Sequence, residues 1–173
     1  MNGILLYLLD ANVFIDANRD YYSFDMVPEF WEWLLHMGVN DKIKIPIEIY
    51  EDITEGSKKD KLTDWIKQSH ARDALILDEA AQVNLVQRVT MEGYASDLTD
   101  IEVDMIGSDS FLISYVLAKP GERCVVTTEV SKPSRKRANR HIPDVCRQLG
   151  VRSCNTFDLL RTLGFNTRWK SHP

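Results

Sequence analysis

The sequence lacks the features of a membrane protein or a disulfide-stabilised secreted protein. Its three cysteines, Cys124, Cys146 and Cys154, are odd in number and form no CxxC pair, which argues against a disulfide framework and against a thiolate zinc site. The apolar run at residues 4–9 is far shorter than the roughly 18–20 residues of a membrane span. There is no positively charged leader with a cleavage site. The sequence therefore predicts a cytoplasmic protein with reduced thiols.

The motifs of several enzyme classes are also absent. The chain contains no GxSxG, GxxxxGK[ST] or GxGxxG motif, which argues against a serine hydrolase, a P-loop and a dinucleotide-binding fold. Its four histidines, at positions 36, 70, 141 and 172, show no metal-ligand spacing with one another or with the cysteines. A histidine-based zinc site and a Cys/His nucleophile pair therefore have little support.

The length and composition fit one ordinary globular domain. The chain has 173 residues, of which 44% are apolar and 27% charged, and this is enough apolar side chain for a single core. No internal repeat, low-complexity tract or Gly/Ser linker divides it. We therefore expect a single domain over residues 1–173.

Charge is distributed unevenly along the chain. The net charge is −5, but residues 1–130 carry −13 and residues 131–173 carry +8. A basic run of this kind is either a solvated loop or a contact strip for a polyanion, since clustered Lys and Arg bind phosphate backbones. The members of the run are Lys132, Arg135, Lys136, Arg137 and Arg140.

Short apolar runs alternate with helical patterns. Strands are predicted at residues 4–9, 43–45, 124–126 and 151–154, and those at 4–9 and 124–126 show no polar alternation, as in strands covered on both faces. Strands separated by helices imply parallel crossovers, and hence an α/β sandwich with a short parallel sheet. Helices are predicted from about residue 12, over 27–37, after Pro46, over 60–70, 78–94, 108–117 and 144–149, while residues 97–104 show no clear period.

Acidic residues follow the predicted strands. In a parallel sheet the ligand site lies at the carboxyl ends of the strands. Asp10 follows the first strand, Glu129 follows the third, and Asp109 begins the most apolar helix. The helix after the second strand adds three acids at nearby positions, Glu48, Glu51 and Asp52.

Carboxylates gathered at one place repel one another and raise one another's pKa unless a cation lies among them. Mg²⁺ or Mn²⁺ prefers such oxygen ligands and is used where phosphate chemistry is done, because it lowers the pKa of a bound water and stabilises the leaving oxygen. The pattern therefore indicates phosphodiester hydrolysis.

Each acid also has a purely structural interpretation. Asp10 and Asp109 are both well placed to cap the helices that follow them. The acids after the second strand can form the solvated face of an amphipathic helix, and Glu129 can pair with the basic run. What favours a site is that all four positions fall at the same end of the predicted sheet.

Several motifs in this order resemble those of PIN domains. The first, LLDANVFI at residues 8–15, is similar to the opening signature of that family, an apolar strand followed by Asp, a small residue and Asn or Ser. The resemblance continues through residues 45–53, 108–113 and 126–129, and a bacterial and archaeal branch of PIN-like proteins is the closest match through residues 21–25, 30–34, 142–146 and 155–157.

This resemblance implies a compact PIN-like α/β/α sandwich and a Mg²⁺- or Mn²⁺-dependent endoribonuclease, commonly the toxin of a VapC-type toxin–antitoxin pair. Asp10 and Asp109 match the metal-binding acids of the family. The second acid is usually Glu, whereas here Asp52 aligns best, with Glu51 and Glu48 as competitors. The fourth is usually Asp but is Glu129 here, Asn12 and Thr127 match polar companions, and Asp144 either joins the site or caps its own helix.

We therefore expect Asp10, Asp52 and Asp109, with Glu129 in a water-mediated role, to hold one or two divalent ions. The basic run would hold the RNA backbone without reading its sequence. The resemblance also implies a small antitoxin and a second copy of the chain as partners. One alternative is a binding module for RNA or protein on the same fold, in which the departures at the second and fourth acids mark a decayed site. Another is a structure-specific DNA nuclease, which would use the same residues.

Overall fold

The computed structural model describes residues 5–55 and 60–171. In these residues four strands form one fully parallel sheet in the order β2-β1-β3-β4. The strands are β1 (Leu6–Leu9), β2 (Ile43–Lys44), β3 (Arg123–Val126) and β4 (Ser153–Cys154). The predicted α/β class with a short parallel sheet is confirmed.

The two central strands are β1 and β3. They pair over their whole length, with Leu8 opposite Val125 and Leu9 opposite Val126, and all four side chains are completely buried. Burial on both faces explains why these strands have no polar alternation in the sequence. The backbone N–H of Asp10 donates to the carbonyl of Val126 at 2.9 Å, so the first residue after β1 lies beside the end of β3.

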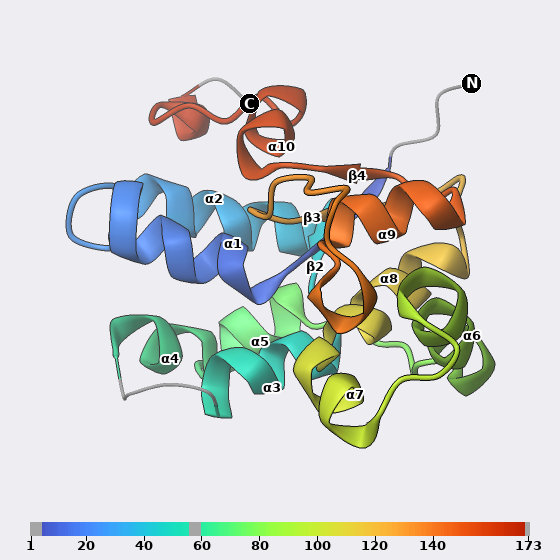
Figure 1. Ribbon diagram of the computed structural model, residues 1–173. Helices are drawn as coiled ribbons and strands as arrows, with labels where there is room; N and C mark the ends of the chain where they lie inside the picture. The colour runs from blue at the N-terminus through green and yellow to red at the C-terminus, as the bar shows by residue number, and fades with distance from the viewer. Residues whose placement is uncertain (1–4, 56–59, 172–173) are drawn as a thin grey trace.

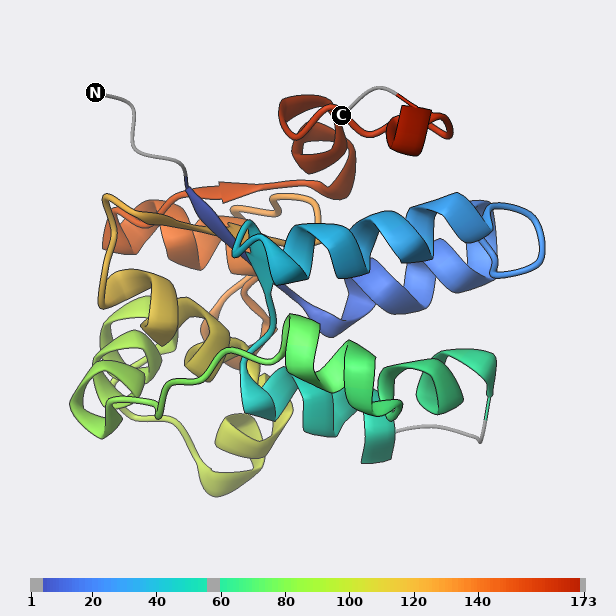
Figure 2. The ribbon, with the colours of Figure 1, turned by 180° about the vertical axis from the view of Figure 1, so that it is seen from behind.

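Helices cover both faces of the sheet and make a three-layer α/β/α sandwich. In both ribbon views α10 lies above the strands, while α3, α5 and α8 lie below them (Figures 1 and 2). The helices are α1 (Ala11–Asp16), α2 (Pro28–Val39), α3 (Ile47–Glu55), α4 (Lys61–Ile66), α5 (Ser69–Leu75), α6 (Val83–Arg88), α7 (Asp100–Ile106), α8 (Asp109–Leu117), α9 (Ile142–Leu149) and α10 (Thr156–Thr162). Two π-helical turns, η1 (Ala17–Tyr21) and η2 (Val89–Tyr94), extend α1 and α6, and η3 (Arg137–Asn139) and η4 (Trp169–Ser171) are short 3₁₀ turns.

The helix α8 is the buried helix that the sequence predicts. It contacts β1 and β3, and Leu112, Ile113 and Val116 are completely buried. Because α8 is packed on all sides, its first residue, Asp109, is held rigidly near the carboxyl ends of these strands. No helix among the described residues is long and apolar enough to span a bilayer.

Three predicted helices differ from the observed ones. The single helix expected over 60–70 is two helices, because Gln68 adopts an extended conformation between α4 and α5. The helix expected over 78–94 begins only at Val83. Residues 97–104, which show no period, contain the start of α7, which Thr99 and Glu102 begin with a reciprocal capping box.

Gly38 allows α2 to pack closely on the chain at α5. A Cβ at this position would lie 2.6 Å from the Ala74 carbonyl oxygen and 2.9 Å from Leu75 Cδ2. We expect Gly38→Ala to lower the free energy of unfolding by about 1–3 kcal/mol, since a backbone atom must shift. Urea unfolding measures this, with Gly121→Ala as the control, because nothing lies within 4 Å of a Cβ built there. Equal stability of the two variants would contradict the close packing.

Candidate functional site

The centre of the candidate site is Asp10, at the carboxyl end of β1. Its side chain is buried, with only 4% exposed. The hydroxyl of Thr127 donates to Asp10 Oδ2 at 2.9 Å, and the N–H of Glu129 donates to the same hydroxyl at 3.1 Å. Although Asp10 is the N-cap residue of α1, its side chain accepts no capping hydrogen bond. The N–H groups of Ala11 and Asn12 nevertheless lower the pKa of the Asp10 carboxyl, so this residue also acts on the first turn of α1.

The environment of Asp10 disfavours its charge. Burial raises the pKa of Asp10 to about 6, and the nearby charge of Glu129 acts in the same direction. The hydrogen bond from Thr127 opposes this shift without cancelling it. A carboxylate is thus held in the core, close to a second negative charge.

The environment of Asp109 disfavours its negative charge more strongly than that of Asp10 does. Burial raises its pKa well above the ordinary value, and the charges of Asp10, Glu129 and Asp52 raise it further, in that order. Ser108 is the N-cap residue of α8 and makes no side-chain capping bond. The structure therefore brings together acids from β1, α3, α8 and the segment after β3, which lie far apart in the sequence.

Of the three candidates on α3, Asp52 is the one whose charge acts on Asp109. Partial desolvation raises the pKa of Asp52, and the Ser108 hydroxyl beside it lowers it. Glu48 instead accepts a hydrogen bond of 3.4 Å from the hydroxyl of Tyr115, more than one turn along α8 from Asp109. Glu51 and Asp52 are both exposed, but Glu51 is not among the groups that raise the pKa of Asp109. The electrostatic contact with Asp109 thus favours Asp52 over Glu48 and Glu51 as the second acid.

Glu129 has a structural contact as well as an electrostatic one. Its Oε2 accepts a hydrogen bond of 2.7 Å from the N–H of Ile142, in the first turn of α9. This is the bond that a helix cap makes, although Glu129 lies on another segment. It does not pair with the basic run, so that interpretation is not supported.

The two contacts of Glu129 can be separated by mutation. We expect Glu129→Ala to lower the free energy of unfolding by about 1 kcal/mol, the usual cost of a lost cap. Glu129→Gln should cost less than half of that, because the amide oxygen still accepts from Ile142 while the charge beside Asp10 is gone. Chemical unfolding of the metal-free protein compares the two. If the free energy of unfolding falls by the same amount in both variants, the hydrogen bond from Glu129 to Ile142 does not stabilise the fold.

Tyr94, at the end of η2, is a site residue that sequence reasoning missed. Its ring is buried, and its hydroxyl has no hydrogen-bond partner in the described residues. Burial and the charges of Asp109 and Glu129 raise the pKa of Tyr94, so the hydroxyl stays protonated and lies within the electrostatic reach of these acids. An aromatic residue ending a helix reads as core in a sequence, and only the fold shows which groups its hydroxyl meets.

The donor set of this acid cluster fits a hard divalent cation. All its charged groups are carboxylates. In the part of the chain that the structure describes, no Lys or Arg is among the groups that shift the pKa of Asp10 or of Asp109. Within residues 5–55 and 60–171, no three His, Cys, Asp or Glu side chains lie close enough to surround an ion. Mg²⁺ usually keeps several waters and takes one or two carboxylates, so an incomplete protein shell is compatible with it.

Comparison with known proteins adds a family. Residues 7–167 match the model of a domain of unknown function, DUF4411. The chain belongs to the DUF4411 family. Among curated proteins and among solved structures, nothing matches it. The description of the family states no activity, so the function of this DUF4411 protein has to be argued from its own residues.

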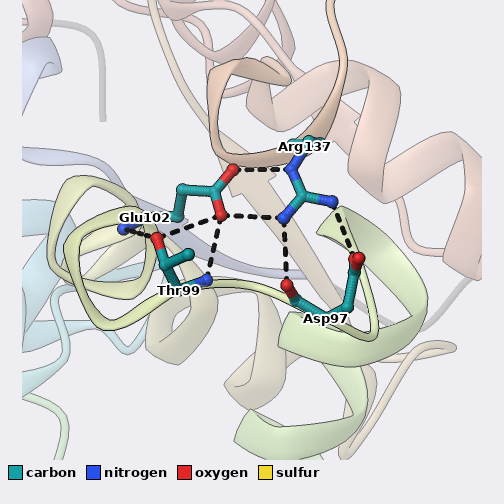
Figure 3. A network of polar contacts seen from close by, with 4 residues as sticks. All are labelled: Asp97, Thr99, Glu102 and Arg137. Atoms are coloured by element: carbon teal, nitrogen blue, oxygen red, sulfur yellow. Dashed lines mark hydrogen bonds and ion pairs between the residues drawn. The ribbon is translucent and has the colours of Figure 1, made fainter.

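Two members of the basic run are bound within the DUF4411 fold. Arg137 donates to both oxygens of Glu102 and to Asp97, and Thr99 bonds the same Glu102 carboxylate (Figure 3). This pairing lowers the pKa of Glu102 to about 2. Arg140 donates to the Gly93 carbonyl and to the side chain of Gln148. Both arginines therefore hold η2, α7 and α9 in place and are not free for a ligand.

Asp144 binds the start of the loop that carries the basic run. It accepts hydrogen bonds from the Ser131 hydroxyl at 2.5 Å and from the Lys132 N–H at 2.7 Å. It thus fixes the start of the basic run and is not one of the acids that act on Asp109. Of the two alternatives open for Asp144, a structural role is the one its contacts support.

Of the other predicted substrate contacts, Thr127 is buried and donates to Asp10, while the rest are accessible. Lys132, Arg135 and Lys136 are exposed, and no acidic side chain of the described residues pairs with them. Asn12 is exposed in the first turn of α1, two residues from Asp10. The unpaired positive charge of the basic run therefore comes from Lys132, Arg135 and Lys136.

Proposed function

We propose that this DUF4411 protein is a metal-dependent endoribonuclease that hydrolyses phosphodiester bonds of RNA. The observation that carries the proposal is the burial of Asp109 beside other acids at the carboxyl ends of a parallel sheet: burial raises its pKa most, and the charges of Asp10, Glu129 and Asp52 raise it further. A fold maintains such repulsion at a cost in stability, and perturbed carboxylates of this kind concentrate at functional sites. Mg²⁺ or Mn²⁺, when bound, would supply an activated water and stabilise the departing oxygen.

The residues of the cluster have distinct tasks in this proposal. Asp10, Asp52 and Asp109 would hold the ion, one or two of them through carboxylate oxygens and the rest through the waters that Mg²⁺ keeps. Thr127 fixes the orientation of Asp10 through its 2.9 Å hydrogen bond. Glu129, tied to the N-terminus of α9, keeps its second oxygen available to orient a water. Asp10 and Thr127 directly follow the buried strands β1 and β3, and Asp109 begins the buried helix α8, which gives the precision that catalysis needs.

Lys132, Arg135 and Lys136 would hold the RNA backbone. Their exposed cations lie on the segment that follows Glu129, so they approach the phosphates on either side of the scissile bond. Contacts of this kind position a nucleic acid without reading its sequence.

The salt dependence of RNA binding tests these contacts. We expect Lys136→Ala to reduce the slope of log K against log salt by about 0.7–0.9, the contribution of one phosphate contact. Lys67→Ala, at the end of α4, is the matched control and should leave the slope unchanged. Fluorescence anisotropy with a labelled RNA in EDTA gives both slopes. A slope equally unaffected in both variants would remove the basic run from the RNA contact.

We further propose that the protein acts in the cell as the toxin of a VapC-type toxin–antitoxin pair. This proposal is supported by the PIN-like motifs, and it places the protein in the cytoplasm with a small antitoxin and a second copy of the chain as partners. Induced expression should then arrest growth, and co-expression of a short neighbouring open reading frame should restore it. Normal growth at a high level of soluble protein would contradict the toxin role but not the nuclease.

Cleavage of labelled RNA tests the activity itself. Purified protein is incubated with single-stranded and hairpin RNA in Mn²⁺, in Mg²⁺ and in EDTA. Cleavage that requires the metal supports the proposal. No cleavage, together with no effect of Mn²⁺ on thermal melting, would mean that the fold serves as a binding module with a decayed site.

A further inference from the structure

The segment between β3 and α9, residues 127–141, is long and has almost no regular structure. It contains only the short turn η3, and loops of this length are uncommon in a compact domain and are often functional. Its first residues include Thr127, which binds Asp10, and Glu129 of the acid cluster. The three exposed cations of the basic run follow. How this segment is held therefore decides where these cations lie relative to the acids.

Two anchors fix the stretch that carries the cations. At its start, the N–H of Lys132 donates to Asp144 on α9 at 2.7 Å. At its end, the turn η3 packs against α7, and Arg137 is the residue that binds α7 there (Figure 1). Arg135 and Lys136 lie between the two anchors, so both anchors determine where they are.

The anchor at α7 uses most of the guanidinium of Arg137. This group donates to the two carboxylate oxygens of Glu102 at 2.6 and 2.8 Å, to Asp97 Oδ1 at 2.7 Å and to the Asp97 carbonyl oxygen at 3.0 Å (Figure 3). Glu102 is itself fixed, because the N–H of Thr99 donates to the same carboxylate at 2.9 Å. A planar guanidinium that makes two bonds to one carboxylate fixes direction as well as distance, which a lysine does not do.

The backbone of Arg137 is strained, and its side chain offsets the strain. Its φ of 54° lies in the left-handed region, which glycine adopts easily and other residues disfavour. Such a conformation persists only where the surrounding contacts impose it. The bonds to Glu102 and Asp97 are contacts that glycine could not make, so they hold η3 in this conformation against α7.

The helix that receives this anchor leads directly to the acid cluster. Only two residues separate the end of α7 from Asp109, the first residue of α8. The anchor therefore joins the segment that carries the cations to the start of the helix that carries Asp109. We propose that Arg137 is a positioning residue, which does not touch the RNA but holds Arg135 and Lys136 at a fixed place for its backbone, an inference that rests on the proposed nuclease function.

RNA binding by variants of the acids that hold Arg137 tests the proposal. The double variant Asp97→Asn/Glu102→Gln removes two negative charges, so charge alone predicts tighter binding of RNA. If Arg137 positions the cations, the variant should instead bind a labelled RNA more weakly, by roughly 2- to 10-fold for each cation that binding must then order. Fluorescence anisotropy in EDTA measures this. Binding that equals or exceeds that of wild type would overturn the proposal.

Two further variants serve as controls. Asp100→Asn/Asp104→Asn makes the same change of charge at exposed positions of α7 that are not partners of Arg137, and it should bind RNA at least as tightly as wild type. Weaker binding in this control, equal to that of the first variant, would overturn the proposal. Asp97→Asn alone leaves the capping box of α7 intact and should show weaker binding at an unchanged melting temperature.

The concentration dependence of cleavage distinguishes positioning from general damage to the fold. In Mn²⁺ the double variant Asp97→Asn/Glu102→Gln should need more RNA to reach half of its maximal single-turnover rate, while the maximal rate stays that of wild type, because the acid cluster is unchanged. A lower maximal rate with an unchanged RNA requirement would overturn the proposal.

Digestion with trypsin separates this proposal from the nuclease function. Trypsin cuts after Arg135 and Lys136, so the rate of these cuts reports how firmly the two residues are held. We expect both cuts to be faster in Asp97→Asn/Glu102→Gln than in wild type, whether or not RNA is cleaved. If no RNA is cleaved, the nuclease proposal fails, and binding and digestion still decide the role of Arg137: weaker binding with faster digestion supports it, and equal binding, equal digestion or no RNA binding by wild type overturns it.

Discussion

Asp109→Asn is expected to stabilise the metal-free protein and to remove its stabilisation by Mn²⁺. At neutral pH the carboxylate of Asp109 is disfavoured by burial and by Asp10, Glu129 and Asp52, and asparagine keeps its shape without its charge. The variant should melt at least 2–4 °C higher than wild type in EDTA, roughly the shift that 1 kcal/mol produces in a chain of this length. Differential scanning calorimetry measures both states.

The control for this prediction is Asp104→Asn, at an exposed position of α7. It should melt like wild type in EDTA and gain the same stabilisation from Mn²⁺. A lower melting temperature of Asp109→Asn in EDTA would show that the charge of Asp109 stabilises the fold. That result would contradict a cluster built for a cation.

The stability of the metal-free protein is expected to fall as the pH rises from about 4 to 7. The pKa of Asp10 is about 6 in the folded protein against 3.8 when unperturbed, so between these values the folded state binds more protons than the unfolded state. Stability is therefore greatest below pH 4 for this group and is lost as the pH passes 6. The contribution of Asp10 is about 3 kcal/mol, at 1.36 kcal/mol per pKa unit.

Urea unfolding in EDTA at pH 4.5 and 7, for wild type and Asp10→Asn, measures this contribution as a difference of differences. Other carboxylates titrate in both proteins and largely cancel. Saturating Mn²⁺ should reverse the sign of the difference, because it favours the charged form. Identical pH dependence of wild type and Asp10→Asn in EDTA would contradict the shifted pKa.

The sheet could be predicted because its strands are short, apolar and separated by helices. The helices were harder where packing, rather than periodicity, decides them. In α7 the apolar residues Ile101, Val103 and Met105 are exposed, so the segment has no amphipathic stripe to detect. The break at Gln68 depends on how α4 and α5 pack, and this is not written in the local sequence.

The acids of the candidate site could be predicted from the rule that strand ends in a parallel sheet converge. The same rule could not choose among Glu48, Glu51 and Asp52, because a helix turn places all three near the strand end. Nor could the sequence show that Arg137 is bound to Asp97 and Glu102, which lie 40 and 35 residues before it. These contacts depend on the tertiary fold.

The most direct test of the account is the single-turnover cleavage rate of a labelled RNA by wild type, Asp10→Asn and Asp104→Asn, each in Mn²⁺ and in EDTA. Wild type and Asp104→Asn should cleave in Mn²⁺ only. The cleavage rate of Asp10→Asn in Mn²⁺ should be about 10²–10⁴-fold lower than that of wild type, since losing a metal ligand removes several kcal/mol of transition-state stabilisation. Cleavage by Asp10→Asn at the wild-type rate, or cleavage that continues in EDTA, would contradict a metal-dependent nuclease built on these acids.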